Sequence, residues 1–257
     1  MGKIVLDERE MKIIELVQQH GFISVENLAD LLSVSPGVIR RELAILERAG
    51  ELERSRGGAI LPSVDNGDKD ASERRLSNSN AKIAMAKQVG QFILDEGTYF
   101  LDSSTTVEAL IPLLKKHKSI TIVTNSVYAA GMLAESGIKT YLAGGLVQAE
   151  SSSTVGYDAI DYMKGFYCDG FIFSCRGLTL DGPGEGNVET QRIKRMMLEH
   201  SSNHILVLDS SKFGLSLLTS VCTLDEIDVV ITNEKPGEAY VKAFEAAGVE
   251  LIVTGNK

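Results

Sequence analysis

The first 60 residues place apolar side chains three and four positions apart, with polar side chains between them. This period is that of an amphipathic α-helix, and it predicts three short helices, over residues 7–20, 25–32 and 36–49. Ser24 and Ser35 stand directly before the second and third of these, where a serine hydroxyl can accept a hydrogen bond from a free backbone N–H group. The pattern therefore predicts a compact three-helix domain at the start of the chain.

The third predicted helix has one clearly apolar face. Ile39, Leu43 and Leu46 recur at spacings of four and three, which places them on one buried stripe. The adjacent Arg40 and Arg41 must then face away from the core. A helix with small residues near its start and arginines on its open side is typical of a recognition helix that enters the major groove of DNA. The open side comprises Gly37, Val38, Arg40, Arg41 and Ala44.

The segment ELERSRGGAILP, residues 51–62, follows this helix and predicts a β-hairpin with a Gly-Gly turn. A hairpin that carries Arg54 and Arg56 beside a recognition helix indicates the wing of a winged helix-turn-helix domain. Acidic residues interleaved with these arginines, among them Glu42 and Glu47, can lie on the opposite face. The alternative is a small helical domain whose solvated basic face does not bind DNA. The predicted DNA-binding residues are Ser35, Pro36, Gly37, Val38, Arg40, Arg41, Arg54 and Arg56.

The pattern changes after residue 62. Residues 63–73 are largely polar and have no period, which predicts a linker between a first domain, 1–62, and a second, 74–257. In the second domain, short apolar runs such as TYFLD, SITIVTN and NHILVLD alternate with amphipathic segments. This alternation predicts an α/β domain with a mainly parallel sheet and helices on its faces.

Polar and glycine residues follow several of the predicted strands. The carboxyl ends of parallel strands meet at one edge of a sheet, which is where ligands bind in such folds. In LDSSTT, residues 101–106, hydroxyl and backbone N–H groups precede a predicted helix, VEALIPLLKK, whose dipole favours an anion. Helix capping explains this cluster equally well, and Lys212 and Arg176 can instead pair with structural carboxylates. The predicted effector-binding residues are Asp102, Ser103, Ser104, Thr105, Thr106, Asn125, Gly144, Gly145, Arg176 and Lys212.

The composition argues against several classes of protein but leaves DNA binding open. The chain has 257 residues, 44% of them hydrophobic, and a formal net charge of −9. Residues 1–62 carry eight basic and ten acidic side chains, so a DNA-binding surface depends on where the arginines lie. No apolar run reaches the length of a membrane span and the charged N-terminus is unlike a signal peptide, so we expect a cytoplasmic protein. The three cysteines are too few and too scattered for a disulfide framework. The pair His200 and His204 has no carboxylate or cysteine partner beside it, so we expect no metal site and no cofactor.

Two stretches carry a family resemblance. LADLLSVSPGVIRRELAILERAGELERSRGGAILP closely resembles the N-terminal winged helix of the DeoR family of bacterial repressors of sugar metabolism. From about residue 74 onward, the chain resembles the family's effector domain through YFLDSSTT, TIVTNS, LAGG, SCRGLTL and LDSSKFG, in family order. Val38 replaces a usual threonine and Ser104 a usual glycine. For the second domain, the resemblance implies the fold of sugar-phosphate isomerases and deaminases, which is also CoA-transferase-like.

The resemblance implies a transcriptional repressor that leaves its operator when a phosphorylated sugar or a related metabolite binds the second domain. One winged helix makes few contacts with double-stranded DNA, so we expect a homo-oligomer, dimer or tetramer, held together by the effector domains. The alternative is a sugar-phosphate isomerase or deaminase with an attached DNA-binding domain, which needs a positioned general base. Asp102, Asp169 and Glu189 are the candidates. No paired acid and histidine accompanies them in the sequence, so we expect no catalytic activity.

Overall fold

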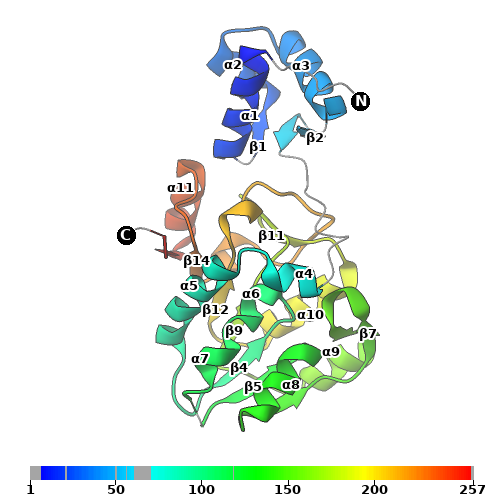
Figure 1. The fold of residues 1–257 in the computed structure, drawn as a ribbon, viewed down its shortest axis with the longest axis vertical. Helices are drawn as coiled ribbons and strands as arrows, with labels where there is room; N and C mark the ends of the chain where they lie inside the picture. Colours follow the sequence, from blue (N-terminus) through cyan, green and yellow to red (C-terminus); the bar gives the residue numbers. More distant parts are fainter. Residues whose placement is uncertain are drawn as a thin grey trace. The chain divides into compact units, whose positions relative to one another are not determined.

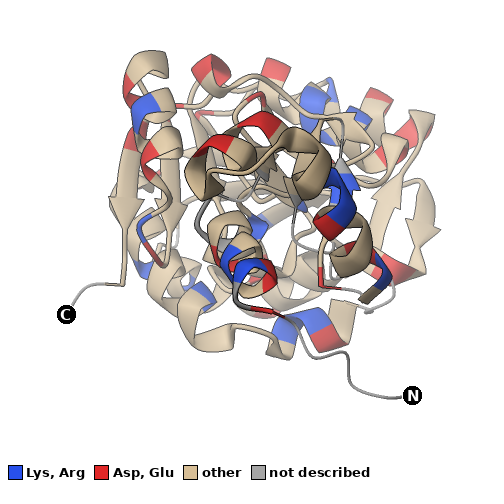
Figure 2. Cartoon of the chain, turned by 90° about the horizontal axis from the view of Figure 1, so that it is seen from above, with Lys and Arg blue, Asp and Glu red and all other residues tan. Residues whose placement is uncertain are grey.

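The computed structural model describes residues 7–20, 22–49, 51–55, 57–60, 71–117 and 119–255 (Figure 1). The chain divides into two compact units, and the change from one to the other falls near residue 66. Most of the expected linker lies outside the described residues, and its last three residues, 71–73, form the first turn of a helix. Basic and acidic residues are interspersed along the ribbon and are not gathered by sign (Figure 2). Among the described residues, no helix has the length and apolar character needed to cross a membrane.

The first unit contains the three helices that the apolar period predicts. Its strands form an antiparallel sheet in the order β1, β3, β2, in which β2 and β3 make the expected hairpin. Strand β1 was not expected, because three residues are too few to show an alternating pattern. The elements are α1 (Glu8–His20), β1 (Phe22–Ser24), α2 (Val25–Leu32), α3 (Pro36–Ala49), β2 (Glu53–Ser55) and β3 (Gly58–Ile60).

Capping side chains hold the starts of the three helices. The Oγ of Ser24 accepts a hydrogen bond from the backbone N–H of Asn27 at 3.1 Å, and that of Ser35 accepts from the N–H three residues later at 3.4 Å. Asp7 forms a complete capping box with Glu10: its carboxylate accepts from the Glu10 N–H at 2.8 Å, and its own N–H donates to Glu10 Oε2 at 2.9 Å. Each cap satisfies N–H groups that the helix itself leaves free.

One apolar core holds these helices and the hairpin together. The predicted stripe of Ile39, Leu43 and Leu46 lies in it, each residue no more than 1% exposed. Burying one such side chain contributes about 1.5–3 kcal/mol, so the stripe fixes which side of α3 is left open. The core consists of Ile13, Val17, Ile23, Val25, Leu28, Ala29, Ile39, Leu43, Leu46, Leu52 and Ala59.

The second unit is built on a seven-stranded parallel sheet in the order β15, β14, β12, β9, β4, β5, β6 (Figure 1). The chain runs from β4 outward to β6 and then returns to β9 on the other side of β4. This reversal creates a topological switch point between β4 and β9, where ligands bind in open parallel sheets. The strands are β4 (Thr98–Leu101), β5 (Thr121–Thr124), β6 (Lys139–Leu142), β9 (Gly170–Phe173), β12 (His204–Val207), β14 (Val229–Thr232) and β15 (Glu250–Val253).

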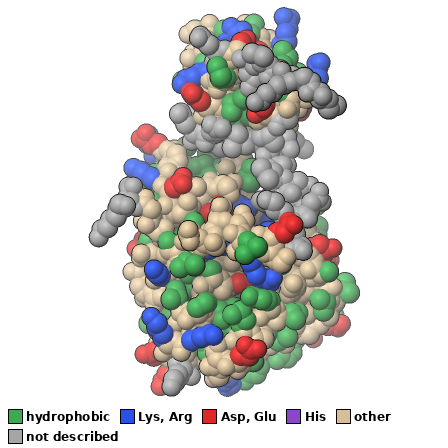
Figure 3. All heavy atoms as spheres, viewed as in Figure 1, with side chains coloured by type: hydrophobic (Ala, Val, Ile, Leu, Met, Phe, Trp, Pro, Cys, Tyr) green, Lys and Arg blue, Asp and Glu red, His purple; other side chains and the backbone are tan. Residues whose placement is uncertain are grey.

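Two small antiparallel sheets accompany the large one, and neither was expected from the sequence. One is a ribbon of β7 (Leu146–Gln148) and β8 (Ser153–Val155). Figure 3 shows hydrophobic side chains on the surface in the region of this ribbon, where Leu146 and Val147 are exposed. The other sheet joins β10 (Gly177–Thr179), β11 (Gly182–Glu185) and β13 (Thr219–Ser220).

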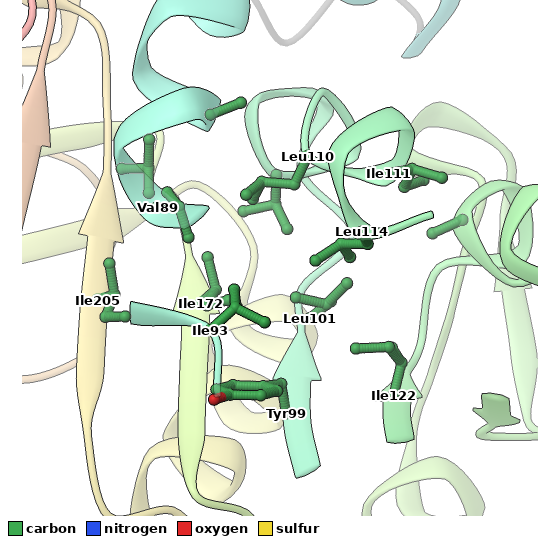
Figure 4. Packing of buried hydrophobic residues seen from close by; sticks show 14 of the residues in the cluster. Val89, Ile93, Tyr99, Leu101, Leu110, Ile111, Leu114, Ile122, Ile172 and Ile205 are labelled. Carbon is green, nitrogen blue, oxygen red and sulfur yellow. The ribbon is translucent and has the colours of Figure 1, made fainter. Parts of the chain in front are cut away.

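Helices pack an apolar layer against the large sheet. Figure 4 shows Val89 of α5, Leu114 of α7 and Leu110, which directly precedes α7, on the side of the sheet that carries Leu101 and Ile172. The single helix expected over VEALIPLLKK is two one-turn helices, α6 and α7, because Pro112 has no N–H to continue the hydrogen-bond ladder. The helices are α4 (Ala71–Leu76), α5 (Ser79–Val89), α6 (Thr105–Glu108), α7 (Ile111–Leu114), α8 (Val127–Glu135), α9 (Tyr157–Met163), α10 (Val188–Glu199) and α11 (Glu238–Ala247).

Candidate DNA-binding surface and effector site

The start of α3 forms the open surface that the sequence predicts. Arg40 and Arg41 are exposed, while Val38 is half-buried at its edge. Small side chains at the first turn leave the backbone accessible, so that the N-terminal end of the helix can approach another surface closely. The exposed residues at this end are Ser35, Pro36, Gly37, Arg40 and Arg41.

Two of the predicted DNA-binding arginines pair with acidic residues at the surface. Arg40 Nη2 lies 3.4 Å from Glu26 Oε1, with side chains 61% and 64% exposed. Arg54 Nε donates to Glu47 Oε2 at 2.8 Å, and this hydrogen bond lowers the pKa of Glu47. Exposed pairs of this kind contribute about 0–1 kcal/mol, so either arginine can exchange its carboxylate for a phosphate at little cost. Arg56 lies outside the described residues.

Glu42 differs from the sequence-based expectation. It does not lie on a solvated face: it is buried, and its Oε1 accepts a hydrogen bond from Arg9 Nε at 2.6 Å. The charge of Arg9 compensates the buried carboxylate and ties α1 to α3. The bond between charged groups also raises the pKa of Arg9. Glu42 therefore helps to orient the recognition helix.

Asp102 anchors the loop at the switch point. It directly follows β4, is 1% exposed, and has four donors around its carboxylate. Oδ2 accepts from Lys194 Nζ at 2.9 Å and from the Ser174 N–H at 3.0 Å, while Oδ1 accepts from the Ser104 N–H at 2.9 Å and its Oγ at 2.6 Å. Because both oxygens are fully engaged, Asp102 fixes the end of β4 beside the end of β9.

Lys194 of α10 completes this anchor, and no sequence motif pointed to it. Its Nζ also contacts Glu185 Oε1 at 2.5 Å and the Ser174 carbonyl oxygen at 2.6 Å. Burial alone would lower the pKa of Lys194, but the charges of Asp102 and Glu185 raise it above its ordinary value. The result is a buried group of one cation and two anions that joins β4, β11 and α10.

The side chains of the LDSSTT loop cap a helix and contact a neighbouring lysine. Ser104 Oγ accepts from the Val107 N–H at 3.3 Å and so caps α6. Since α6 has only four residues, the helix-dipole argument made from the sequence does not hold. Thr105 has a different role: its Oγ1 accepts from Lys82 Nζ at 3.1 Å. Ser103, Thr105 and Thr106 are largely buried, so only small parts of their surfaces face solvent.

Four basic side chains converge on this edge of the sheet. The pKa of Lys82 is lowered to about 8, mainly by burial; the charge of Asp209 opposes this shift, and the charges of Lys212 and Arg74 add to it. Arg74 has its own pKa lowered by burial and by the charge of Arg176. The Nε of Arg74 is buried and has no hydrogen-bond partner among the described residues. The sequence pointed to Lys212 and Arg176, but not to Lys82 or Arg74, which precede β4 on helices without any motif.

The remaining predicted effector residues take different positions. Asn125 follows β5 and is buried; its Nδ2 donates to the Thr154 carbonyl at 3.0 Å, while its Oδ1 has no partner in the described part of the chain. Gly144 and Gly145 are exposed between β6 and β7. At Gly145, with φ of 142°, an added Cβ would lie 2.8 Å from the Val155 carbonyl oxygen, so glycine is needed there for packing.

Each of the three candidate general bases is engaged with other groups of the protein. Asp102 is fully hydrogen-bonded, as described above. Asp169 lies at the opposite edge of the sheet, where its Oδ2 accepts from the N–H of Thr98 at the start of β4 at 2.8 Å. Glu189 lies in the first turn of α10, with Oε1 3.4 Å from Arg192 Nη1. Asp102 and Asp169 therefore lie at opposite edges of the sheet and cannot act together on one substrate.

Comparison with known proteins finds two family models that match successive parts of the chain. A model of the DeoR-like helix-turn-helix domain matches residues 9–64, and one of the DeoR C terminal sensor domain matches residues 77–234. The HTH-type transcriptional repressor GlcR of Bacillus subtilis is 32% identical over 249 residues, covering 96% of each chain. The Glycerol-3-phosphate regulon repressor of Escherichia coli is 32% identical over 246 residues, covering 95% of this chain and 97% of that protein.

Solved structures show a more distant likeness. Ribose 5-phosphate isomerase A from Methanocaldococcus jannaschii is similar with a TM-score of 0.41 and 12% sequence identity, over 53% of this chain and 55% of that chain.

Proposed function

This chain belongs to the DeoR family of bacterial transcriptional regulators, and on that premise we propose that it represses a carbohydrate-utilisation operon in the cytoplasm and leaves its operator when a phosphorylated sugar binds. Repressors of this family are similar to it along nearly the whole chain, across both domains. The domain order, with a winged helix before a sensor domain, agrees with a regulator in which ligand binding in one domain changes DNA binding in the other.

The convergence of four cations carries the effector part of the proposal. Burial destabilises the charged forms of Lys82 and Arg74, and neighbouring cations add to this: Lys212 and Arg74 act on Lys82, and Arg176 acts on Arg74. A phosphate dianion relieves this repulsion and accepts hydrogen bonds from several donors at once. The hydroxyl of Thr105 beside Lys82 adds a neutral donor of the kind that phosphates accept.

The DNA part of the proposal rests on the open side of α3. We propose that Arg40 and Arg41 reach base edges or phosphates in a major groove and that Arg54 on the wing contacts the backbone beside it. Val38 offers a methyl group to thymine at the edge of the same surface. One such domain makes too few contacts for tight binding, so we propose a dimer or tetramer.

Catalysis is not part of the proposal. The carboxylate of Asp102 is saturated by four donors, Asp169 lies at the opposite edge of the sheet, and Glu189 is paired with Arg192. A sugar phosphate held at this edge therefore meets groups that bind it, and neither Asp102 nor Asp169 is available to take its protons.

Fluorescence anisotropy of a labelled duplex from upstream of this gene's own operon tests the proposal. We expect tight binding that weakens with salt and is released by one member of a panel of sugar phosphates. Arg40→Ala with Arg41→Ala should reduce operator affinity and lower the salt slope by about 1 for each lost phosphate contact. Arg48→Ala, on the last turn of the same helix, is the matched control. Normal operator binding by the double variant would overturn the assignment of α3.

A further inference from the structure

The first helix of the effector domain, α4, is held mainly by polar contacts. Ala71 is buried, but Leu76 is 81% exposed, so the helix contributes little apolar surface to the core. Elements with few buried apolar contacts open more readily than those packed in the core. Along the sequence, α4 is also the first described element after residues 61–70, which connect it to the DNA-binding domain.

An ion pair between Arg75 and Glu108 attaches α4 to α6. Arg75 Nε donates to Glu108 Oε2 at 2.7 Å and its Nη2 donates to Oε1 at 3.2 Å. The Glu108 side chain is 3% exposed, and Ser126 Oγ donates to it at 3.3 Å. The guanidinium carbon of Arg75 lies 3.7 Å from the centroid of the Tyr128 ring. This geometry is bidentate and stacked, which makes it stronger and more directional than an ordinary surface pair.

The pair also depends on both partners being charged. Burial raises the pKa of Glu108, and the hydrogen bond and charge of Arg75 act against that rise. Removing Arg75 therefore leaves a buried carboxyl group without its main compensating charge. Glu108 is the last residue of α6, the helix that begins within the LDSSTT loop. Through this pair, α4 is attached to the same loop that carries Thr105.

The neighbouring residue connects α4 to the effector site itself. The backbone carbonyl of Arg74 accepts hydrogen bonds from Lys82 Nζ and from Thr105 Oγ1, the latter at 3.4 Å. Lys82 Nζ also donates to Thr105 Oγ1 at 3.1 Å. The donors that hold the backbone of α4 are thus the same donors that the proposed function assigns to a phosphate. An anion that engages them weakens their bonds to the Arg74 carbonyl.

We propose that α4 transmits effector binding to the linker: a bound phosphate draws Lys82 and Thr105 away from the Arg74 carbonyl, and α4 loosens. Arg75 and Glu108 are positioning residues that keep α4 docked in the ligand-free protein. This inference rests on the proposed function and specifies how that site is regulated. It identifies the ligand-free protein as the state in which α4 is most protected.

Hydrogen exchange of the full-length protein tests this, with inorganic phosphate as the probe and calorimetry to measure its binding. In the unaltered protein, phosphate should accelerate amide exchange in residues 71–77 by about tenfold. Arg75→Met should accelerate it without phosphate, leave little further response, and raise phosphate affinity by up to about tenfold, because α4 is then already loosened and coupling between two events is reciprocal. Arg75→Lys preserves the charge and should restore part of the protection. Arg195→Met, which breaks ion pairs on α10, is the matched control and should leave exchange of α4 as it was.

The outcomes distinguish a failure of the proposed effector site from a failure of the role given to α4. If phosphate does not bind the unaltered protein, the proposed effector site is wrong and this inference fails with it. If phosphate binds but exchange in residues 71–77 does not change, the effector site stands and the role of α4 is refuted. If Arg75→Met responds to phosphate as the unaltered protein does, the positioning role of the pair is refuted.

Discussion

At the scale of single residues, the proposed effector site is characterised by a buried lysine, Lys82, that has other cations close to it. Lys82 is largely buried and donates to one hydroxyl and one backbone carbonyl, neither of which neutralises its charge. Its pKa is lowered from 10.5 to about 8, mainly by burial, with the charge of Asp209 opposing the shift and those of Lys212 and Arg74 adding to it. The charged form therefore costs free energy of folding below a pH of about 8, and this cost decreases as the pH rises toward 10.5.

Because the pKa of Lys82 lies at about 8, we expect the affinity of the site for anions to depend on pH. Sulfate, whose charge is constant near neutral pH, should bind more weakly as the pH rises through about 8, because Lys82 then loses its proton. Calorimetric titrations between about pH 7 and pH 9 measure this change. Lys82→Met should bind sulfate weakly at every pH and lack the step. A step of full size in that variant would assign the titration to another group.

At the scale of elements, the buried group of Asp102, Lys194 and Glu185 explains how the edge of the sheet keeps its shape. It joins the end of β4 to β11 and α10, two neighbouring elements that lie far from β4 in the sequence. Burying charges is costly, and the arrangement is tolerated because every partner is hydrogen-bonded. Its main contribution is therefore to fix the loop geometry at the switch point.

Removing the central cation should destabilise the effector domain. Lys194→Met leaves Asp102 and Glu185 buried without compensation, and we expect a loss of about 3–5 kcal/mol in the free energy of unfolding. Urea denaturation followed by circular dichroism measures it. Arg195→Met, at the next position but partly exposed, should cost less than about 1 kcal/mol. Equal losses for the two variants would contradict the role given to Lys194.

The sequence predicted those elements whose signals are local. The three helices of the first domain follow from their apolar period and caps, and the position of LDSSTT follows from its place after an apolar strand. The split between α6 and α7 was missed because the apolar pattern continues across Pro112. Lys82 and Arg74 were missed for a different reason: helices α4 and α5 reach the switch point only through tertiary packing, which leaves no local pattern. Lys194 was hidden in the same way.

At the scale of the whole molecule, each chain has one recognition helix, so operator affinity depends on copy number. A second copy bound to the first raises the effective concentration of the second winged helix near the DNA. The spacing between half-sites must then match the geometry of the assembly.

Duplex design tests this directly. Two half-sites placed one helical turn apart, or a multiple of it, should bind at least about 10²-fold more tightly than one half-site. Inserting about half a turn between them should remove most of the gain, because the second domain then faces the wrong side of the duplex. Anisotropy titrations at one salt concentration compare the three duplexes. Equal affinity for all of them would mean that a single domain binds DNA by itself.

The mutual repulsion of the four basic side chains also bears on how long the protein survives in a cell. An anion that binds only the folded domain adds about 2.7 kcal/mol to its stability when present at a hundredfold excess over its dissociation constant. The unfolded population then falls by about a hundredfold, and with it the supply of chains open to proteolysis. If the proposed site binds the effector, we expect the regulator to be turned over faster when the effector is scarce, so that its abundance follows the concentration of that metabolite.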